Sequence, residues 1–164
     1  MKESKRLIYL GEKNNQNLNQ LWENCFVGAK NQEHMNAHNP YPVPNQQALD
    51  QFLMRESTYR TWLVKRKKEE DIIGFLIHGD FIPHLPNSIG FNVGRKYTKN
   101  GYATEMLETL LRDLEDKNLQ ETYGYCFSSN TPSIKTMMKC GFKNMGATGN
   151  YHNGNQEIKF KRVI

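Results

Sequence analysis

The stretch from Gly90 to Leu107 reads GFNVGRKYTKNGYATEML. Its start is apolar and predicts a strand over Ile89–Val93, and its end starts an amphipathic pattern typical of a helix. The turn between them ends at Asn100 and Gly101, so the helix begins with unpaired N–H groups at the positive end of its dipole. A helix start of this kind binds phosphate groups. Further positive charge comes from Arg95, Lys96 and Lys99.

Outward from this stretch, the spacing of apolar residues predicts the other elements. Short apolar or alternating runs predict strands over Leu7–Leu10, Thr61–Arg66, Ile72–His78, Thr122–Phe127, Phe142–Met145 and Glu157–Val163. Apolar residues three and four apart predict helices over Leu18–Phe26, Asn45–Glu56 and Ala103–Leu114, and from an N-cap at Thr131 to a stop at Gly141. Segments without such spacing are expected to be irregular or solvated, namely Ala29–Pro44, the hairpin tip Lys67–Asp71 and the loop Gly146–Gln156.

The predicted order is strand, two helices, three strands, helix, strand, helix and two strands. The strand-helix-strand unit around the central helix should be parallel with a right-handed crossover, while the hairpins are antiparallel. We therefore expect a mixed α+β or α/β sheet, with residues 1–164 forming one domain.

Composition limits the classes of function without choosing one. The net charge of +5 suits a nucleotide or coenzyme and equally a nucleic acid. Three cysteines without a Cys-x-x-Cys pair argue against a disulfide framework or a zinc site. His34 and His38 are four residues apart, but the Asn and Pro residues around them argue against a helix, so we predict no metal site. Without a signal peptide or a long apolar run, the expected location is the cytoplasm.

Three motifs together resemble the GNAT acetyltransferases. They are Lys99-Asn-Gly-Tyr-Ala-Thr-Glu105, Asn130-x-x-Ser133-Ile134 and Gly141-Phe142. The match is closest to the RimJ/RimL-like branch, the ribosomal-protein N-terminal acetyltransferases and their relatives, and is specific over about Ile89 to Gly146. The resemblance implies the GNAT fold, with a mixed, mostly antiparallel sheet splayed between the strand ending at Val93 and the strand Thr122–Phe127. The wedge between these strands would hold acetyl-CoA.

The resemblance also assigns roles to residues. The main chain of Phe91, Asn92 and Val93 would pair with the pantetheine arm, and Asn130 would hydrogen-bond that arm. The pyrophosphate would lie on Thr98, Lys99, Asn100, Gly101, Tyr102, Ala103 and Thr104. Thr98 stands where the family pattern has Gln or Arg, and main-chain N–H groups would carry most of the recognition.

Catalysis needs an acid for the departing thiolate and a base for the amine. Many GNATs use a tyrosine where this chain has Met137, so we predict Ser133 as the donor to the CoA sulfur, directly or through water. The base remains open among ordered water, Asn87, Ser88, His84, His152 and Glu157.

The leading hypothesis is an N-acetyltransferase that moves the acetyl group of acetyl-CoA to a primary amine by direct attack in a ternary complex. The family branch favours a protein N-terminal amine over a small-molecule amine, and acceptor choice would lie in the rims Gly28–Pro44 and Gly146–Gln156. Met137 and the missing base motivate an alternative, a non-catalytic acyl-CoA-binding sensor or interaction module. A nucleic-acid partner is not expected, because the chain lacks a ribonucleoprotein-type aromatic motif. A membrane partner is not expected either.

Individual residues also have structural interpretations. Asn130 and Ser133 are residue types common at helix starts. Tyr123, Tyr125 and Phe127 could line an acceptor pocket or simply pack on the sheet.

Overall fold

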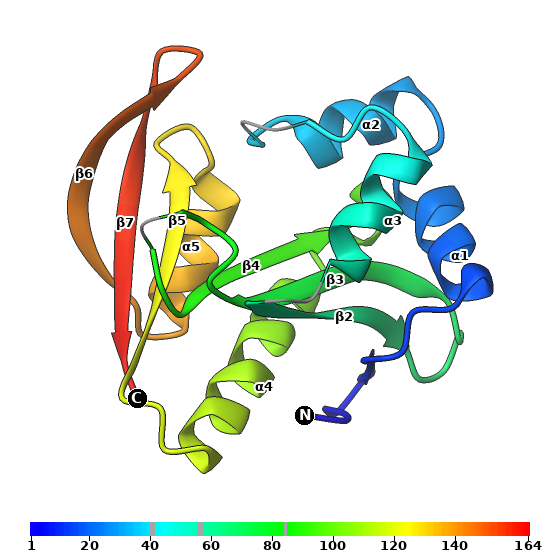
Figure 1. The fold of residues 1–164 in the computed structure, drawn as a ribbon, viewed down its shortest axis with the longest axis horizontal. Coiled ribbons are helices and arrows are strands. Elements are labelled where there is room, and N and C mark those ends of the chain that lie inside the picture. The colour runs from blue at the N-terminus through cyan, green and yellow to red at the C-terminus, as the bar shows by residue number, and fades with distance from the viewer. Residues whose placement is uncertain (40–41, 56–57, 84) are drawn as a thin grey trace.

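A computed structural model describes residues 1–39, 42–55, 58–83 and 85–164. It contains a seven-stranded sheet in the order β1-β2-β3-β4-β5-β7-β6 (Figure 1). The strands are β1 Leu7–Leu10, β2 Tyr59–Arg66, β3 Ile72–Gly79, β4 Ser88–Val93, β5 Glu121–Phe127, β6 Lys143–His152 and β7 Asn155–Val163. The helices are α1 Asn15–Cys25, α2 Ala29–Asn36, α3 Gln46–Met54, the 3-10 helix η1 Arg95–Tyr97, α4 Tyr102–Asp116 and α5 Thr131–Lys139.

The sheet is mixed, as expected from the order of elements. Neighbouring strands are antiparallel except β4 and β5, which run parallel. The chain crosses from β4 to β5 through the helix α4. β4 pairs with β3 along its whole length, from Ser88 to Val93. Its pairing with β5 is limited to Ser88↔Tyr123 and Ile89↔Gly124. The two strands therefore part after Ile89, as the sequence predicted.

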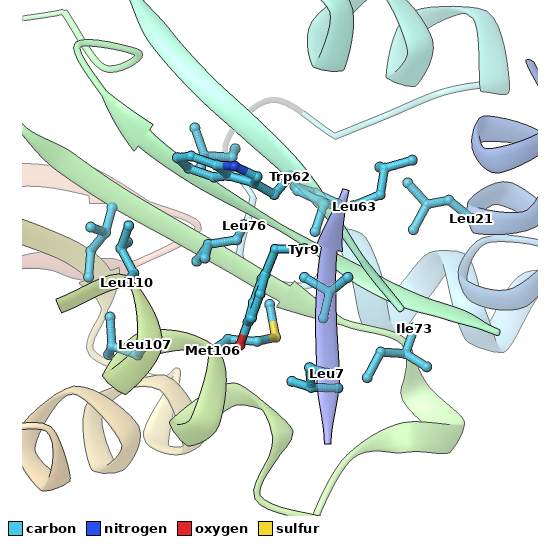
Figure 2. Packing of buried hydrophobic residues seen from close by; sticks show 14 of the residues in the cluster. Leu7, Tyr9, Leu21, Trp62, Leu63, Ile73, Leu76, Met106, Leu107 and Leu110 are labelled. Atoms are coloured by element: carbon cyan, nitrogen blue, oxygen red, sulfur yellow. The ribbon is translucent and has the colours of Figure 1, made fainter. Parts of the chain in front are cut away.

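Helices cover both faces of the sheet (Figure 1). Alternate strand residues are apolar on each face, so each face buries a separate set of side chains. Figure 2 shows Met106, Leu107 and Leu110 of α4 on the same side of the sheet as Tyr9, and Leu21 of α1 on the other side. All five are at most 4% exposed. This double-sided core fixes β4 between two packed layers.

The prediction of an irregular segment over Ala29–Pro44 is wrong for its first half, which forms α2. Polar helices of this kind show little apolar periodicity in sequence, and tertiary contacts determine whether they form. Met35 is buried, and the side chain of Asn36 accepts a hydrogen bond from Val43 N at 2.8 Å. The described residues before β2 therefore form three helices instead of two.

The predicted loop over Gly146–Gln156 is also wrong. β6 continues to His152 and β7 begins at Asn155, joined by a tight turn in which Asn153 and Gly154 have φ angles of 48° and 77°. Asn-Gly is the signature of a two-residue hairpin turn. Apolar alternation did not reveal the strand because nearly all of β6 is solvent-exposed.

Helix ends follow the predictions with one correction. α4 ends before Asn118, which has a φ of 56°, and α5 ends before Gly141, which has a φ of 81°. The N-cap of α5 is Asn130 and not Thr131, since the Asn130 side chain accepts a hydrogen bond from Ser133 N. α3 ends at Met54, and the predicted end at Glu56 lies outside the described residues. In the described part of the chain, no helix has the length and apolarity needed to cross a membrane.

Gly74→Ala should destabilise the fold by about 1–3 kcal/mol, because overpacking carries that cost. A Cβ atom at Gly74 would lie 2.0 Å from the main-chain oxygen of Asn92 and would push β3 away from β4. Urea unfolding measures the change. Gly11→Ala is the matched control, since a Cβ there meets no atom within 4 Å. Equal stability of the two variants would contradict the packing of β3 on β4.

Candidate functional site

The unpaired edge of β4 presents backbone groups toward β5. Gly94 N donates to Ile73 O at 2.8 Å, so the backbone groups of Gly94 point toward β3. Because backbone direction alternates along an antiparallel strand, those of Phe91 and Val93 point the other way. Neither residue has a partner in β5. The predicted pantetheine contacts at Phe91 and Val93 thus lie on an open edge, whereas Asn92 faces β3.

α5 packs against β5 where the two strands part. A Cβ atom at Gly124 would lie 2.4 Å from the sulfur of Met137, and Ile89 lies beside the same point. Met137 is 1% exposed. The position that carries a tyrosine in many GNATs is therefore a packing residue here, at the apex of the splay.

The turn before α4 has the conformation that the sequence predicted. Lys99 and Gly101 have φ angles of 64° and 76°, and Gly101 is the N-cap of α4. The side chain of Asn100 donates to the main-chain oxygens of Tyr97 and Thr98, which closes the turn. Among the described hydrogen bonds, none uses the N–H groups of Gly101, Tyr102, Ala103 and Thr104. The Thr98 hydroxyl donates to Arg95 O at 2.8 Å, so it serves the turn itself.

A buried tyrosine anchors this turn to the β2–β3 hairpin. The Tyr97 hydroxyl donates to Asp71 Oδ2 at 2.9 Å, and Asp71 accepts two further hydrogen bonds from Arg66, at 2.6 and 2.8 Å. The hydrogen bond from Arg66 is the main cause that lowers the pKa of Asp71. Burial is the main cause that raises the pKa of Tyr97, and the hydrogen bond to Asp71 raises it further. Asp71 is thus a structural anchor and not the solvated hairpin residue that the sequence suggested.

The first turn of α4 is also tied to the N-terminal segment. Arg6 Nε donates to Glu105 Oε2 at 2.6 Å, and Arg6 Nη1 donates to Asn100 O at 2.9 Å. The guanidinium carbon lies 4.5 Å from the centre of the Tyr102 ring. Ser4 Oγ donates to Glu105 Oε1 at 2.7 Å. No local pattern predicts these contacts, because about a hundred residues separate the partners.

Asn130 and Ser133 lie together at the start of α5. The Asn130 side-chain oxygen accepts from Ser133 N at 3.3 Å, which is the capping role considered from the sequence. Burial raises the pKa of the Cys126 thiol in β5 to about 12, while the nearby Ser133 side chain acts in the opposite direction. Both predicted residues therefore lie beside β5, the strand that borders the splay opposite β4.

His34 is a site residue that the sequence analysis missed. It lies in α2, and its Nε2 contacts Val93 O at 2.9 Å. Because a carbonyl oxygen only accepts, Nε2 carries the proton and donates. This hydrogen bond places α2 at the open end of β4. In the sequence, the four-residue spacing of His34 and His38 suggested only a pair of metal-binding residues. In the described residues, no group of three or more His, Cys, Asp or Glu side chains could hold a metal ion.

The candidate bases are spread over the site. Glu157 of β7 pairs with Phe127 at the end of β5 and accepts hydrogen bonds from Thr148 and Asn150. The His152 ring lies tilted against the Phe127 ring, with the ring centroids 5.2 Å apart and the planes at 33° to each other. Ser88, the first residue of β4, is buried and donates to Leu85 O. The main-chain oxygen of Asn87 accepts from Thr122 and Tyr123, and His84 lies outside the described residues.

The aromatic residues of β5 differ in burial. Phe127 is 6% exposed, whereas Tyr123 and Tyr125 are half-buried. The Tyr123 ring lies 4.4 Å from Lys159 Nζ, so it packs on β7. Burial raises the pKa of Tyr125 to about 12, and its hydroxyl has no hydrogen-bond partner among the described residues.

A cavity of about 1270 Å³ opens between α3 and the loop after β3. Its aromatic walls are Phe52, Tyr59 and Phe81, and Asp50 and Asp80 add carboxylates. The Phe81 ring covers Gly90, where a Cβ atom would lie 3.2 Å from it. The cavity thus adjoins the first β4 residue beyond the pairing with β5, and the sequence-predicted site residues do not line its described wall.

Comparison with known proteins adds a family match and shared folds. The family profile described as "Acetyltransferase (GNAT) domain" matches residues 19–143. A GNAT-family acetyltransferase from Bacillus anthracis has a TM-score of 0.80 at 18% identity, covering 98% of this chain and 96% of that one. RimL, the ribosomal L7/L12 alpha-N-protein acetyltransferase in complex with coenzyme A, has a TM-score of 0.79 at 16% identity with the same coverage.

A curated relative matches over a shorter length. It is a threonine–tRNA ligase from Acinetobacter baylyi, 28% identical over 92 residues, or 52% of this chain. The chain spans 13% of that protein. The match therefore concerns one segment and carries no ligase activity over to this chain.

Tyr97→Phe should lower the free energy of unfolding by about 1–3 kcal/mol, since it removes a hydrogen bond to the charged Asp71. Urea unfolding followed by circular dichroism measures it. Tyr151→Phe, at a tyrosine that is 64% exposed, is the control and should stay close to wild type. If both variants match wild type, Tyr97 does not anchor the turn.

Proposed function

Because the chain belongs to the GNAT acetyltransferase family, we propose that it transfers the acetyl group of acetyl-CoA to a primary amine by direct attack in a ternary complex. The GNAT resemblance and mixed sheet predicted from the sequence are confirmed, and with them the class of acetyl-CoA-dependent acetyltransferases. Residues 1–164 would act as one domain. Three free, buried cysteines agree with a cytoplasmic location.

One observation carries the proposal. The edge of β4 beyond Ile89 lacks a β5 partner in the described sheet, and the same chain segment leads directly to the start of α4. There, no hydrogen bond between described residues uses the N–H groups of Gly101 to Thr104. An extended amide chain can pair with the first feature, and a diphosphate can bind the second. The pantetheine and pyrophosphate of acetyl-CoA are joined in that order, so one ligand would satisfy both.

The residues of the site would then divide the work. The backbone groups of Phe91 and the N–H of Val93 would hold the pantetheine arm, since Val93 O already accepts from His34. The N–H groups of Gly101 to Thr104 would hold the pyrophosphate. The backbone of Asn92 faces β3, so Asn92 would contribute by holding Phe91 and Val93 in the strand and not by contacting the pantetheine arm. Thr98, Lys99 and Asn100 would shape the turn and add charge, and Asn130 would contact the arm from the β5 side.

The chemistry requires a neutral amine, a stabilised oxyanion and a protonated leaving group. As the new C–N bond forms and the C–S bond breaks, a main-chain N–H near Val93 would stabilise the charge on the carbonyl oxygen. Ser133 would give a proton to the departing sulfur, directly or through water, and recover one from solvent. The amine nitrogen would lose its proton to water or to a nearby base. Glu157 and His152, at the end of β5, stay candidates with the others.

A protein N-terminal amine is the favoured acceptor. An α-amine with a pKa near 8 is roughly 10% neutral at pH 7, while a lysine amine at about 10.4 is neutral only about 0.04% of the time. An α-amine therefore needs less help from a catalytic base than a lysine amine does. The cavity beside Gly90 would admit the acceptor, since its two carboxylates outnumber the one cation of its described wall, Arg55, and so suit a cationic amine. Its aromatic walls suit an apolar side chain or a cation. A small-molecule amine would fit the same chemistry.

A non-catalytic acyl-CoA-binding module is the second candidate. Two observations favour it: Met137 is a buried packing residue, and the Asn130 oxygen already caps α5. Such a module would bind acetyl-CoA without consuming it.

Ser133→Ala tests the enzyme against the module. The variant should lose about 10²–10⁴-fold in kcat, the range of general acid catalysis, with little change in the KM for acetyl-CoA. Thiol release measures the rate, and mass spectrometry of mixed amines and N-terminal peptides identifies the acceptor by the gain of one acetyl group. Ser129→Ala, at an exposed serine of the preceding loop, is the control. Turnover of wild type that does not exceed the variant's would favour the module.

Gly101→Asp tests the placement of the coenzyme. A carboxylate at position 101 would lie against the pyrophosphate and should abolish binding of acetyl-CoA in calorimetry, because like charges in contact repel strongly. Gly146→Asp, at another positive-φ glycine with open space around it, carries the same charge and backbone strain and should retain binding. Retained affinity in Gly101→Asp would show that the phosphates bind elsewhere.

A further inference from the structure

We propose that Arg6 is a phosphate-binding residue of the coenzyme site, an inference that rests on the function proposed above. Arg6 lies before β1, at the far end of the chain from the site motifs. Its guanidinium nevertheless lies beside the turn that would hold the pyrophosphate.

Three contacts fix this guanidinium against the turn. Nη1 donates to Asn100 O, Nε donates to Glu105, and the guanidinium carbon lies over the Tyr102 ring. Asn100, Tyr102 and Glu105 bracket Gly101, the N-cap of α4. The second terminal nitrogen, Nη2, lies 3.5 Å from the position of a Cβ atom on Gly101. It makes none of the hydrogen bonds recorded for the described residues, so it can donate to an anion on the turn.

Arg6 supplies what the turn itself lacks. The family pattern places Gln or Arg at position 98, where this chain has Thr98. The Thr98 hydroxyl already donates a hydrogen bond to Arg95 O. A guanidinium binds phosphate through a planar fork of N–H donors. Held by three contacts, Arg6 loses little freedom when a phosphate arrives. The cation would thus come from the N-terminal segment instead of the turn.

Glu105 makes the charge of Arg6 necessary. A carboxylate in the first turn of α4 suits the helix dipole but repels a diphosphate bound at the same end. Burial favours the neutral acid, yet hydrogen bonds from Arg6 N, Ser4 and the Arg6 guanidinium outweigh it and lower the pKa of Glu105. Glu105 therefore stays ionised at neutral pH. Arg6 neutralises it, so removing Arg6 would expose a negative charge as well as delete a positive one.

The phosphate could be the diphosphate or the 3′-phosphate of CoA, which present the same chemistry. Calorimetry with three ligands separates them: CoA, dephospho-CoA without the 3′-phosphate, and pantetheine without any phosphate. The variants are Arg6→Gln and the control Lys5→Gln, which removes the same charge at an exposed neighbour.

Arg6→Gln should weaken CoA binding by about tenfold or more, the value of a hydrogen bond to a charged group, and leave pantetheine binding unchanged. Lys5→Gln should change CoA binding less than about twofold, as expected for a solvent-screened charge. If the loss persists with dephospho-CoA, Arg6 binds the diphosphate; if it disappears, Arg6 binds the 3′-phosphate. In the double variant Arg6→Gln with Glu105→Gln, part of the CoA affinity should return.

Equal effects of Arg6→Gln and Lys5→Gln on CoA would overturn the proposal. So would an equal loss for CoA and pantetheine, because a damaged fold weakens both ligands and leaves their ratio unchanged. If wild type binds no CoA at all, the proposed function fails, and that outcome is distinct from a failure of Arg6 alone.

Discussion

The end of backbone pairing between β4 and β5 is the constraint on which the site depends. The parallel ladder stops at Ile89↔Gly124, and the next residues of β4 keep their partners in β3 alone. Unpaired backbone groups in a sheet are costly when buried and are a template for an added strand when accessible. Met137, packed on Gly124, occupies the apex where the strands part. The separation of the two strands is therefore part of the core packing.

The turn before α4 depends on contacts from distant parts of the chain. Tyr97 anchors it to Asp71 in the β2–β3 hairpin, and Arg6 anchors the first turn of α4 to the N-terminal segment. A left-handed Lys99 and Gly101 would otherwise be free to relax. Holding the N–H groups in place before the ligand arrives reduces the entropy lost on binding. The α2 helix completes this arrangement, since His34 reaches the last carbonyl of β4.

Much of this could be predicted from the sequence, because the signals are local. The strand, the Asn-Gly turn and the amphipathic α4 follow one another, and the Asn130 and Ser133 motif lies one strand later. The missed elements lacked such signals: α2 is polar, and β6 is exposed on both faces. The contacts of Arg6, Asp71 and His34 join residues distant in sequence. No periodicity or motif records such pairs, so only the fold brings them into view.

Hydrogen exchange with and without acetyl-CoA tests the central claim most directly, because it reports on the backbone groups themselves. We predict slower exchange at Phe91, at Val93 and from Gly101 to Thr104 when acetyl-CoA is added, with little change along the exposed strand β6. Unchanged exchange at those amides under saturating acetyl-CoA, or protection confined to the cavity beside α3, would contradict the account.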